Sequence, residues 1–402
     1  MRRAVSEVAR LARDRGERIH LVGGAVRDLL LRRPVRDLDL VLEGDASQFA
    51  AALASRLAAK AVVVHARFGT ATLELPEGVR LDVAATRRES YAYPGALPTV
   101  SLGASLEEDL ARRDFTIHAI ALELSGRRRS LRDPFGGRAD LARRRLRFLH
   151  PASPADDPTR AFRAVRYANR LGFSLAPEAR REVAAALAIG AFDAVSGDRL
   201  RREMELFLAE PRRAQAVNRI VRLGLDGAVA SGLARAAAGA PERVRAAERL
   251  AERRDVGWLC YFLAWMGPAP TRALREVADR LALSGRDALA VKRWSSTRRR
   301  LGPGIARLSP SRRRLRAQGL SSEEVLAAAA LRAGSDRRAL ATMESREAPE
   351  LAISGQDLLA RGVPQGRAIG RALAATRAAL EDGRVSPGGE LAFALAHARR
   401  AR

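Results

Sequence analysis

Residues 19–44 read IHLVGGAVRDLLLRRPVRDLDLVLEG, and this stretch decides the fold of the N-terminal part. The apolar run 19–22 is typical of a short strand, and Gly23 and Gly24 follow it directly. Residues 25–31 favour a helix that ends at Pro34, whose ring cannot continue it. Residues 35–42 then alternate apolar and charged side chains, as a half-buried strand does. The stretch therefore predicts a strand, a tight turn, a helix and a second strand.

Two carboxylates stand two residues apart on the second of these strands. Asp37 and Asp39 point to the same face, because side chains alternate along a strand. Two negative charges this close need a cation, and carboxylate oxygens suit Mg²⁺, which shares its other positions with substrate phosphates. The glycine turn lets backbone amides approach phosphate oxygens at a helix start, and Arg27 adds a planar donor fork. A glycine pair or an Asp-x-Asp alone is usually structural, but the joint spacing is more specific.

Outward from this stretch, the pattern changes once along the chain. Strands are expected at 61–65, 70–75 and 79–83, with a turn marked by Pro76 and Gly78. Beyond Pro151 the alternation disappears, and helical periodicity continues to the C-terminus. The sequence therefore predicts an α+β protein, in which a small mixed sheet within the first ~150 residues precedes an all-helical remainder.

The composition of the 402 residues is basic and nearly free of cysteine. The formal net charge is +26. A polyanionic partner such as nucleic acid explains that charge, but an arginine bias does so equally, since lysine occurs only at Lys60 and Lys292. The single cysteine, Cys260, excludes an internal disulfide and is expected to be buried and inert. No apolar stretch suits a signal peptide or a membrane span, so we expect a cytoplasmic protein.

Two further segments combine arginine with aspartate. Residues 112–119 read RRDFTIHA, and residues 156–167 read DDPTRAFRAVRY. In the second segment Pro158 suits a first helical turn and Asp157 its cap. Arginines then follow at helical spacing of three, at Arg160, Arg163 and Arg166. Solvated arginines would be the default interpretation, but the intervening apolar residues predict a half-buried helix.

In this order and spacing, the three segments resemble motifs of the class II CCA-adding enzyme and bacterial poly(A) polymerase family. The resemblance implies that Asp37 and Asp39 are catalytic ligands of Mg²⁺. It also implies nucleotide-binding roles for eight residues: Gly24 and Arg27 at the nucleotide, Arg113 and Asp114 beside the ribose, Asp157 and Arg160 at the base, and Arg163 and Arg166 in support of that edge or at the triphosphate. Asp82 is a candidate third metal carboxylate, with a solvent-facing strand residue as the alternative. The sequence departs from the family pattern at His118, where asparagine is usual, and at Asp156, where glutamate is usual.

The resemblance also implies a domain order and an activity. We expect a polymerase-beta-like nucleotidyltransferase head at 1–145, a base-recognising helical neck at 146–210, a helical body at 211–320 and a tRNA-binding helical tail at 321–402. The expected activity is addition of C, C and A to the 3′ end of tRNA from CTP and ATP by two-metal phosphoryl transfer. The substrate tRNA is the expected partner, with no membrane and no protein partner inferred. Trp294, within an arginine-rich stretch, is a candidate for stacking on RNA.

Several alternatives stay open at this point. Addition of A alone is the nearest, because a loop at 87–104 argues only against CC-only addition. Poly(A) polymerase is less favoured, since residues 62–69 lack the basic aromatic block of that group. A non-catalytic basic RNA-binding protein would be expected to show damage at Asp37 or Asp39, and both are present. A nucleotidyltransferase for small molecules or proteins would need neither the helical length nor the charge.

Overall fold

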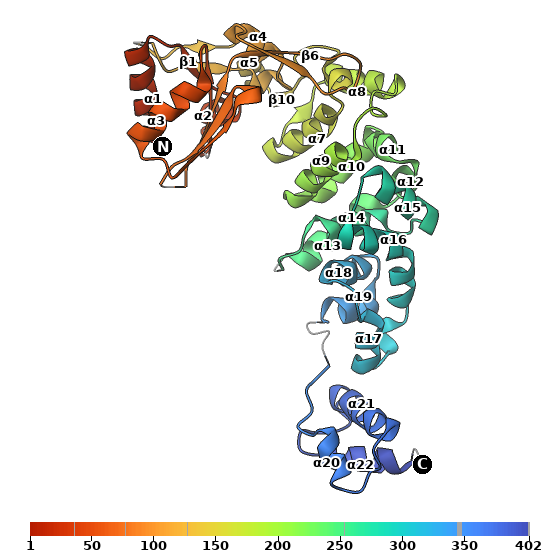
Figure 1. The fold of residues 1–402 in the computed structure, drawn as a ribbon. Coiled ribbons are helices and arrows are strands. Elements are labelled where there is room, and N and C mark those ends of the chain that lie inside the picture. Colours follow the sequence, from red (N-terminus) through yellow and green to blue (C-terminus); the bar gives the residue numbers. More distant parts are fainter. Residues whose placement is uncertain (36, 77, 127, 253, 344–347, 401–402) are drawn as a thin grey trace. The chain divides into compact units, whose positions relative to one another are not determined.

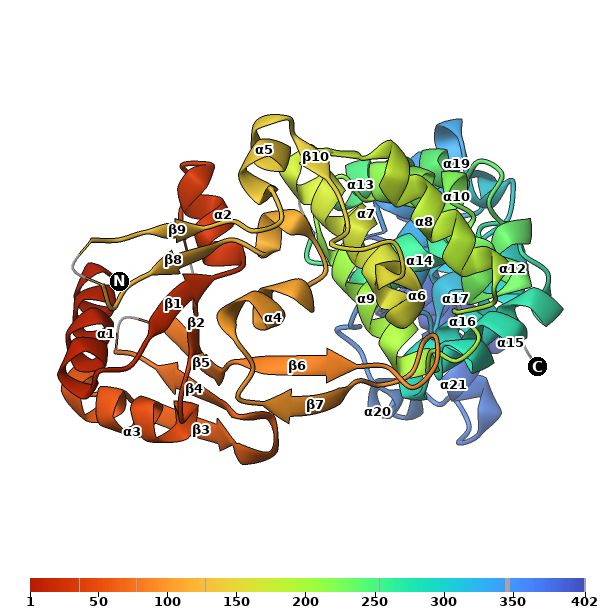
Figure 2. The ribbon, with the colours of Figure 1, turned by 90° about the horizontal axis from the view of Figure 1, so that it is seen from above.

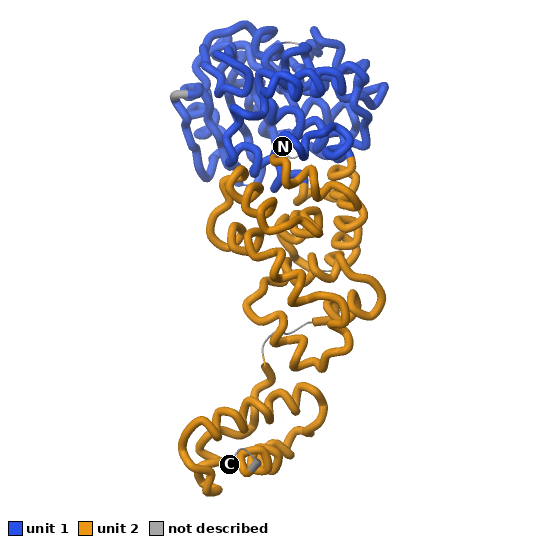
Figure 3. Tube along the Cα trace, turned by 90° about the vertical axis from the view of Figure 1, so that its right-hand side faces the viewer, with its two compact units in different colours: residues 1–207, 219–229 blue, residues 208–218, 230–402 orange. Residues whose placement is uncertain are grey.

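The computed structural model describes residues 1–35, 37–76, 78–126, 128–252, 254–343 and 348–400 (Figure 1). Arg36, which precedes the carboxylate pair in the sequence motif, lies outside the described residues. The chain forms two compact units, one of residues 1–207 and 219–229 and the other of residues 208–218 and 230–402 (Figure 3). We call these unit 1 and unit 2. The finer division into head, neck, body and tail stays a prediction.

A seven-stranded mixed sheet forms the first part of unit 1 (Figure 2). Its order is β3-β4-β5-β2-β1-β8-β9, and β2 and β5 run parallel while the other neighbours are antiparallel. The strands are β1 Ile19–Val22, β2 Asp37–Leu42, β3 Ala61–His65, β4 Thr70–Glu74, β5 Arg80–Ala85, β8 Ala121–Glu123 and β9 Leu131–Arg132. The predicted mixed sheet is confirmed, and β8 and β9 are strands that the sequence pattern did not indicate.

Strand β2 shows why the alternating sequence forms a half-buried strand. Leu38 and Leu40 are each 2% exposed, whereas Asp37 is exposed and Asp39 partly buried. The side chain of Val41, which shares the face of the two aspartates, packs in a cluster with Leu110 of α4 (Leu106–Ala111). Helix α3 (Ala46–Leu57) lies against β3, β4 and β5 and packs with α1 (Arg2–Arg15). Apolar burial thus leaves the carboxylates at the surface of the sheet.

The predicted loop at residues 87–104 is a two-stranded hairpin of β6 (Arg87–Ser90) and β7 (Thr99–Leu102). It runs from the sheet toward α6 (Ser153–Asp156), as Figure 2 shows. Near its tip the Gly95 amide donates to the carbonyl oxygens of Ala155 and Asp156. Gly95 has a φ of +79°, and a Cβ there would lie 2.6 Å from the Ala191 carbonyl oxygen. Only glycine fits this position. The two hydrogen bonds of the Gly95 amide and its close approach to Ala191 dock the hairpin on the helical part of unit 1.

The remaining elements of unit 1 are short helices and a small parallel pair of strands. The unit begins its helical part near residue 150, as the loss of alternation predicted. Helices α9 and α10 each cross a boundary between the units. These elements are α2 Gly24–Leu30, α5 Gly137–Ala142, α7 Thr159–Leu171, α8 Pro177–Ala188, α9 Gly197–Ala209, α10 Arg213–Arg222, α11 Leu225–Val229, η1 Ala66–Phe68, η2 Thr116–His118, β10 Arg145–Leu146 and β11 Ser174–Leu175.

Unit 2 is helical. Its core contains α14, in which Cys260 and Trp265 are fully buried, and burial raises the pKa of the Cys260 thiol to about 12. The helices are α12 Ser231–Arg235, α13 Ala240–Ala251, α14 Trp258–Met266, α15 Thr271–Arg280, α16 Gly285–Arg300, α17 Pro310–Ala317, α18 Ser322–Ala330, α19 Gly334–Ala341, α20 Gly355–Leu359, α21 Arg367–Glu381 and α22 Glu390–Arg400, with η3 Ile305–Arg307. None of the described helices combines the length and the apolar character that a bilayer span requires.

The hypothesis that Trp294 stacks on RNA is wrong. Its side chain is 0% exposed within α16, and its indole N–H donates to the Gly267 carbonyl oxygen at 3.2 Å. The arginine-rich sequence around it suggested a solvated junction, but the helix turns this one aromatic residue inward. The basic charge and the aromatic ring therefore lie on different sides of the same helix.

Candidate active site

The carboxylate pair of β2 lies beside a third aspartate on the neighbouring strand. Asp39 is in register with Asp82 of β5, and Asp37 with Arg80. Registered residues of paired strands point to the same face, and the strands are about 4.8 Å apart. Three carboxylates of two strands therefore gather on one surface of the sheet, with one arginine among them.

The neighbouring charges and the burial of Asp39 change the pKa of its carboxyl group. Burial raises the pKa of the Asp39 carboxyl, and the negative charges of Asp82 and Asp37 act in the same direction, while Arg113 opposes them. A bound cation would remove this penalty, and the donors present are carboxylate oxygens, which suit a hard ion such as Mg²⁺. In the described part of the chain, no cluster of three or more His, Cys, Asp or Glu side chains is arranged as a ready metal site. The pair thus fits an ion whose remaining ligands come from substrate and water.

Asp82 differs from the other two carboxylates in its partners. Its Oδ1 accepts a hydrogen bond from the Thr72 hydroxyl, and its Oδ2 lies 3.1 Å from Arg80 Nε. Asp82 raises the pKa of the Arg80 guanidinium through this hydrogen bond. To act as a third metal ligand, Asp82 would have to exchange Arg80 for the ion.

The glycine turn gives the site its open space. Gly23 has a φ of +67°, and a Cβ at this position would lie 3.1 Å from Arg113 Nη1 and 3.7 Å from Asp39 Oδ2. A side chain would fill the gap between this carboxylate and this guanidinium. Gly24, the residue expected to contact the nucleotide, begins α2 instead and faces Arg27, with 3.5 Å from its Cβ position to Nη2. Gly23 is therefore the glycine next to the carboxylates, which the motif comparison missed.

Arg27 is buried and held by two side chains. Its Nε and Nη2 donate to the Asp28 carboxylate at 2.9 and 2.8 Å, and its Nη1 donates to His118 Nε2 at 2.8 Å. A guanidinium has five N–H donors, so two N–H groups of Arg27 are not used by these three hydrogen bonds.

A buried chain of polar contacts continues from Arg27 into α7. The His118 Nδ1 donates to Asp114 Oδ1 at 2.8 Å, and Arg163 donates to Asp114 Oδ2 through Nε at 2.9 Å and Nη2 at 2.6 Å. Burial alone would raise the pKa of the Asp114 carboxyl, but His118 and Arg163 hold it well below its usual range. The rings of His118 and Tyr167 meet edge-on at 4.5 Å. His118 therefore links Arg27 to Asp114, and Asp114 in turn binds Arg163.

Arg113 is placed by the start of α4. The hydroxyl of Ser105 accepts from the Glu108 amide, and the Glu108 carboxylate accepts from the Ser105 amide, which is a capping box. The fully buried Asp109 then accepts from Arg112 at 2.8 Å and from Arg113 Nη2 at 3.0 Å. The buried Nε of Arg113 has no partner among the described residues. Arg113 is thus anchored at one nitrogen and keeps donors near Asp39.

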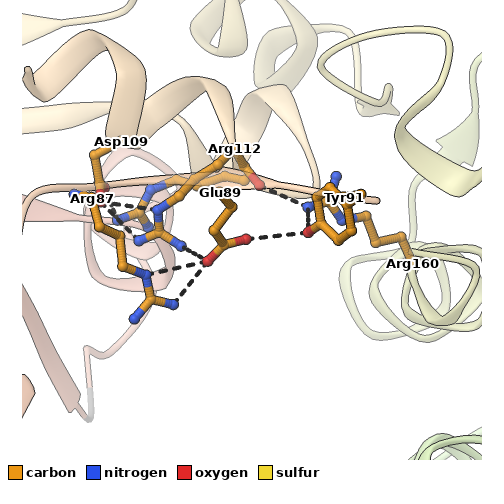
Figure 4. Close-up of polar contacts among 7 residues, drawn as sticks. Arg87, Glu89, Tyr91, Asp109, Arg112 and Arg160 are labelled. Atoms are coloured by element: carbon orange, nitrogen blue, oxygen red, sulfur yellow. Dashed lines mark hydrogen bonds and ion pairs between the residues drawn. The ribbon is translucent and has the colours of Figure 1, made fainter. Parts of the chain in front are cut away.

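The hairpin contributes a network that reaches the predicted base-recognition helix (Figure 4). Glu89 of β6 lies 2.9 Å from Arg87 Nη2 and 2.8 Å from Arg112 Nη1. The Tyr91 hydroxyl donates to Glu89 Oε2 at 3.2 Å and accepts from Arg160 Nη2 at 3.1 Å. Burial raises the pKa of the Tyr91 phenol to about 12, so it keeps the proton that it donates.

Arg160 and Asp157, expected to form one edge together, have different partners. Arg160 is 5% exposed and also donates to the Ser153 hydroxyl at 2.7 Å and to the Arg112 carbonyl oxygen at 2.8 Å. Asp157 accepts from the amide and the hydroxyl of Thr159, at 3.1 and 2.6 Å, where α7 begins.

Arg199 completes the environment of Asp157. Its Nη2 donates to the same Asp157 oxygen, Oδ1, at 2.7 Å, and its Nη1 to the Gly95 carbonyl oxygen of the hairpin. The other carboxylate oxygen, Oδ2, accepts nothing from the described residues. Arg166, the last arginine of the predicted series, lies 3.4 Å from Glu203 Oε2. Arg163 also lies 4.0 Å from Glu203, so Arg163 and Arg166 share this carboxylate while Arg160 contacts other groups.

Sequence reasoning missed several residues of this site. Asp109, Glu89 and Ser153 hold the predicted arginines in place, yet none belongs to a quoted motif. A signal existed for Asp109, since Ser105 and Glu108 have capping-box spacing and Arg113 follows Asp109 at four residues. No sequence motif marked Glu89 or Ser153. Glu89 meets Arg112, which lies 23 residues further along the chain, and Ser153 of α6 meets Arg160 of the next helix, α7.

A mixed sheet with paired carboxylates beside a glycine turn, followed by helices that carry buried arginines, defines the nucleotidyltransferase class of head. Residues 19–147 match the model of the poly A polymerase head domain. A CC-adding tRNA nucleotidyltransferase of Deinococcus radiodurans is 36% identical, over 93% of this chain and 88% of its own length. An A-adding tRNA nucleotidyltransferase of Geobacter sulfurreducens is 37% identical over 66% of this chain. The chain spans only 23% to 36% of the length of the A-adding relatives.

Solved structures resemble the whole chain. The Thermotoga maritima CCA-adding enzyme complexed with tRNA is 26% identical, with a TM-score of 0.79 and coverage of 98% of this chain and 94% of its own. Structures of CCA-adding enzyme with ATP and with CTP give TM-scores of 0.80 and 0.79, at 25% and 26% identity, and cover 96% of this chain and 93% of theirs. This protein belongs to the class II CCA-adding enzyme and tRNA nucleotidyltransferase family.

Proposed function

We propose that this protein adds C, C and A to the 3′ end of tRNA, from CTP and ATP, with release of pyrophosphate. The observation that carries the proposal is the intact carboxylate pair, Asp37 and Asp39, beside the open turn at Gly23. It stands in a chain that matches a tRNA nucleotidyltransferase over 93% of its length. A tRNA substrate also implies a cytoplasmic location.

The carboxylate pair would hold Mg²⁺, and the arginines would hold the triphosphate. When bound, Mg²⁺ supplies charge neutralisation at the phosphates and favours the ionised form of the attacking hydroxyl. Arg27 has two unused N–H donors at the start of α2, and these can donate to phosphate oxygens. Arg113 presents its Nη1 at the Gly23 turn beside Asp39. Arg27 and Arg113 would thus position the triphosphate next to Asp37 and Asp39.

Base selection would use the groups of Asp157 and Arg160 that remain free. Asp157 Oδ2 can accept from the exocyclic amine of cytosine or adenine, and Arg160 keeps two N–H donors after its three hydrogen bonds. Guanine and uracil present the opposite polarity, and each buried group left unpaired costs about 1–3 kcal/mol. The helix α7 would therefore take the role of a template.

The similar proteins carry three different activities, which are addition of CCA, of A alone and of CC alone. Complete addition is our choice, because the segment 87–104, whose presence argues against CC-only addition, forms a hairpin that contacts Arg160 at the base site. Addition of A alone is the second candidate, favoured by the names of the A-adding relatives. Addition of CC alone is favoured by the name of the relative that matches over 93% of this chain.

One experiment distinguishes these members. Purified protein is incubated with Mg²⁺, labelled CTP or ATP, and tRNA that lacks its last one, two or three nucleotides. Complete addition predicts C on the two shorter substrates and A on the longest. An A-only enzyme extends only the longest, a CC-only enzyme only the two shorter ones, and a poly(A) polymerase makes long A tails.

A pair of variants tests the catalytic assignment. Asp37→Asn should abolish incorporation while tRNA affinity, measured by filter binding, stays nearly unchanged. Asp14→Asn is the matched control, because Asp14 is a half-exposed carboxylate of α1 paired with Arg56. Wild-type rates in Asp37→Asn would refute the assignment, and tRNA binding without incorporation by the wild-type protein would indicate the non-catalytic alternative.

A further inference from the structure

His118 is a buried residue at which two parts of the candidate site meet. Its ring is 6% exposed and packs between Phe115, at 5.5 Å, and Tyr167, at 4.5 Å. Its two nitrogens face different partners, Arg27 of α2 and Asp114, each at 2.8 Å. Both nitrogens are therefore used, and neither is open to a ligand.

The partners determine which nitrogen carries the proton. A guanidinium can only donate, so Nε2, which faces Arg27, must be the acceptor. An ionised carboxylate can only accept, so Nδ1, which faces Asp114, must carry the hydrogen. The neutral Nδ1–H tautomer is the only form that satisfies both contacts, whereas an imidazolium would place its second N–H, on Nε2, against an N–H of Arg27.

The charged groups around the ring agree with a neutral histidine. Burial lowers the pKa of His118, the Asp114 carboxylate opposes this, and the positive charges of Arg27 and Arg163 lower it further. Tyr167 of α7, the other titratable group on the ring, meets it edge-on. The packing of three elements, α2, η2 and α7, thus favours the uncharged form.

We propose that His118 is a positioning residue that couples the triphosphate side of the site, through Arg27, to the sugar side, through Asp114. This inference rests on the proposed function for the roles of these two partners. His118 holds Nη1 of the Arg27 guanidinium, and the other two nitrogens, Nε and Nη2, both donate to Asp28. It also supplies one of the two side-chain partners that hold Asp114, Arg163 being the other.

Two amide variants separate the two contacts of the ring. The amide of an asparagine reaches about as far as Nδ1, so His118→Asn should keep the bond to Asp114 and lose that to Arg27. The longer His118→Gln should keep an acceptor for Arg27 and lose the donor to Asp114. The variant His118→Phe keeps the aromatic packing and loses both contacts.

Equilibrium binding of CTP and dCTP, measured by calorimetry, gives the readout. We expect His118→Asn to weaken CTP about 5- to 10-fold with an unchanged preference for CTP over dCTP. His118→Gln should lower that preference and change CTP affinity less, and His118→Phe should show both defects. His65→Gln, at an exposed histidine of β3, is the control. Wild-type behaviour in His118→Phe, or the same profile in both amide variants, would overturn the proposal.

The tautomer gives a second test that needs no activity. The chain has five histidines, so the ring nitrogens of ¹⁵N-histidine-labelled protein can be assigned by comparison with His118→Gln. The expected signal is a neutral Nδ1–H ring that persists below pH 6.5. An imidazolium or an Nε2–H tautomer at pH 7.5 would contradict the inference. Failure of tRNA extension with intact CTP binding would instead count against the proposed function alone.

Discussion

The hydroxyl of Tyr91 connects the hairpin to the arginine of the proposed base edge, and its removal gives a measurable prediction. In Tyr91→Phe, Arg160 loses one of its three hydrogen bonds and keeps those to Ser153 and to the Arg112 carbonyl oxygen. Glu89 loses the phenol donor and keeps its two arginine partners. The ring stays in place, so packing is conserved and only the contact changes.

The magnitude follows from the partners that remain. A hydrogen bond to a charged group contributes about 1.5–3 kcal/mol, and we expect the lower end, because Tyr91 is only partly buried and Arg160 keeps two anchors. If a loss of about 1.5 kcal/mol falls on the orientation of Arg160, discrimination between CTP and UTP falls about tenfold. The unfolding midpoint of the protein should fall by about 2–4 °C.

Single-turnover incorporation on tRNA lacking its last three nucleotides measures this discrimination as a ratio of rates for CTP and UTP. Tyr93→Phe is the matched control, because Tyr93 lies in the same hairpin and is 62% exposed. If Tyr91→Phe keeps wild-type discrimination, the hairpin does not orient Arg160 through this hydroxyl. If both variants change equally, the effect belongs to the hairpin in general.

Three further changes test other parts of the site. Arg160→Ala should relax discrimination against UTP and GTP by about 10- to 100-fold and slow CTP incorporation less; equal slowing for all four nucleotides would contradict base recognition. Asp109→Asn should lower the free energy of unfolding by about 2–3 kcal/mol in urea titrations, because Arg112 and Arg113 lose a buried counter-charge; an unchanged midpoint would refute this. The raised pKa of Asp39 means that its charge destabilises the fold at neutral pH and that this cost fades as the pH falls through that pKa. Mg²⁺ should therefore raise the unfolding midpoint at pH 7.5, less so at acidic pH and in Asp39→Asn, and equal shifts in both proteins would contradict the metal assignment.

Part of the site could be predicted because its signals are local. The alternation around Asp37 and Asp39 determines which face of β2 they occupy, and the glycine pair marks a turn that only a small residue allows. These features depend on residues within a few positions of each other. The strand, the helix after it and the onset of the helical part were accordingly predicted close to their observed bounds.

The hydrogen-bond partners of the site side chains could not be predicted, because they depend on tertiary contacts. The spacing of the α7 arginines suggested one shared surface, yet Arg160 bonds to Tyr91 of the hairpin while Arg163 bonds to Asp114. Asp82 was correctly identified as a strand residue, but only the register of β4 and β5 brings Thr72 to it. The hairpin at 87–104 was likewise predicted only as a loop, because its two strands show no clear alternation of apolar and polar residues.

The arginines of the site also show what the net charge of +26 can and cannot explain. Arg27, Arg163 and Arg112 each face a carboxylate within unit 1, so their charges are balanced locally and add little to long-range attraction of a polyanion. Arginine suits this place for another reason, because its planar fork can be fixed at some nitrogens and still offer others. Arg27 keeps two donors after three bonds. Lysine has three N–H donors on one freely rotating nitrogen, so it would hold a protein partner and a phosphate in a less fixed geometry. The specificity of the site should therefore depend on these fixed forks, and recruitment of RNA on other arginines of the chain.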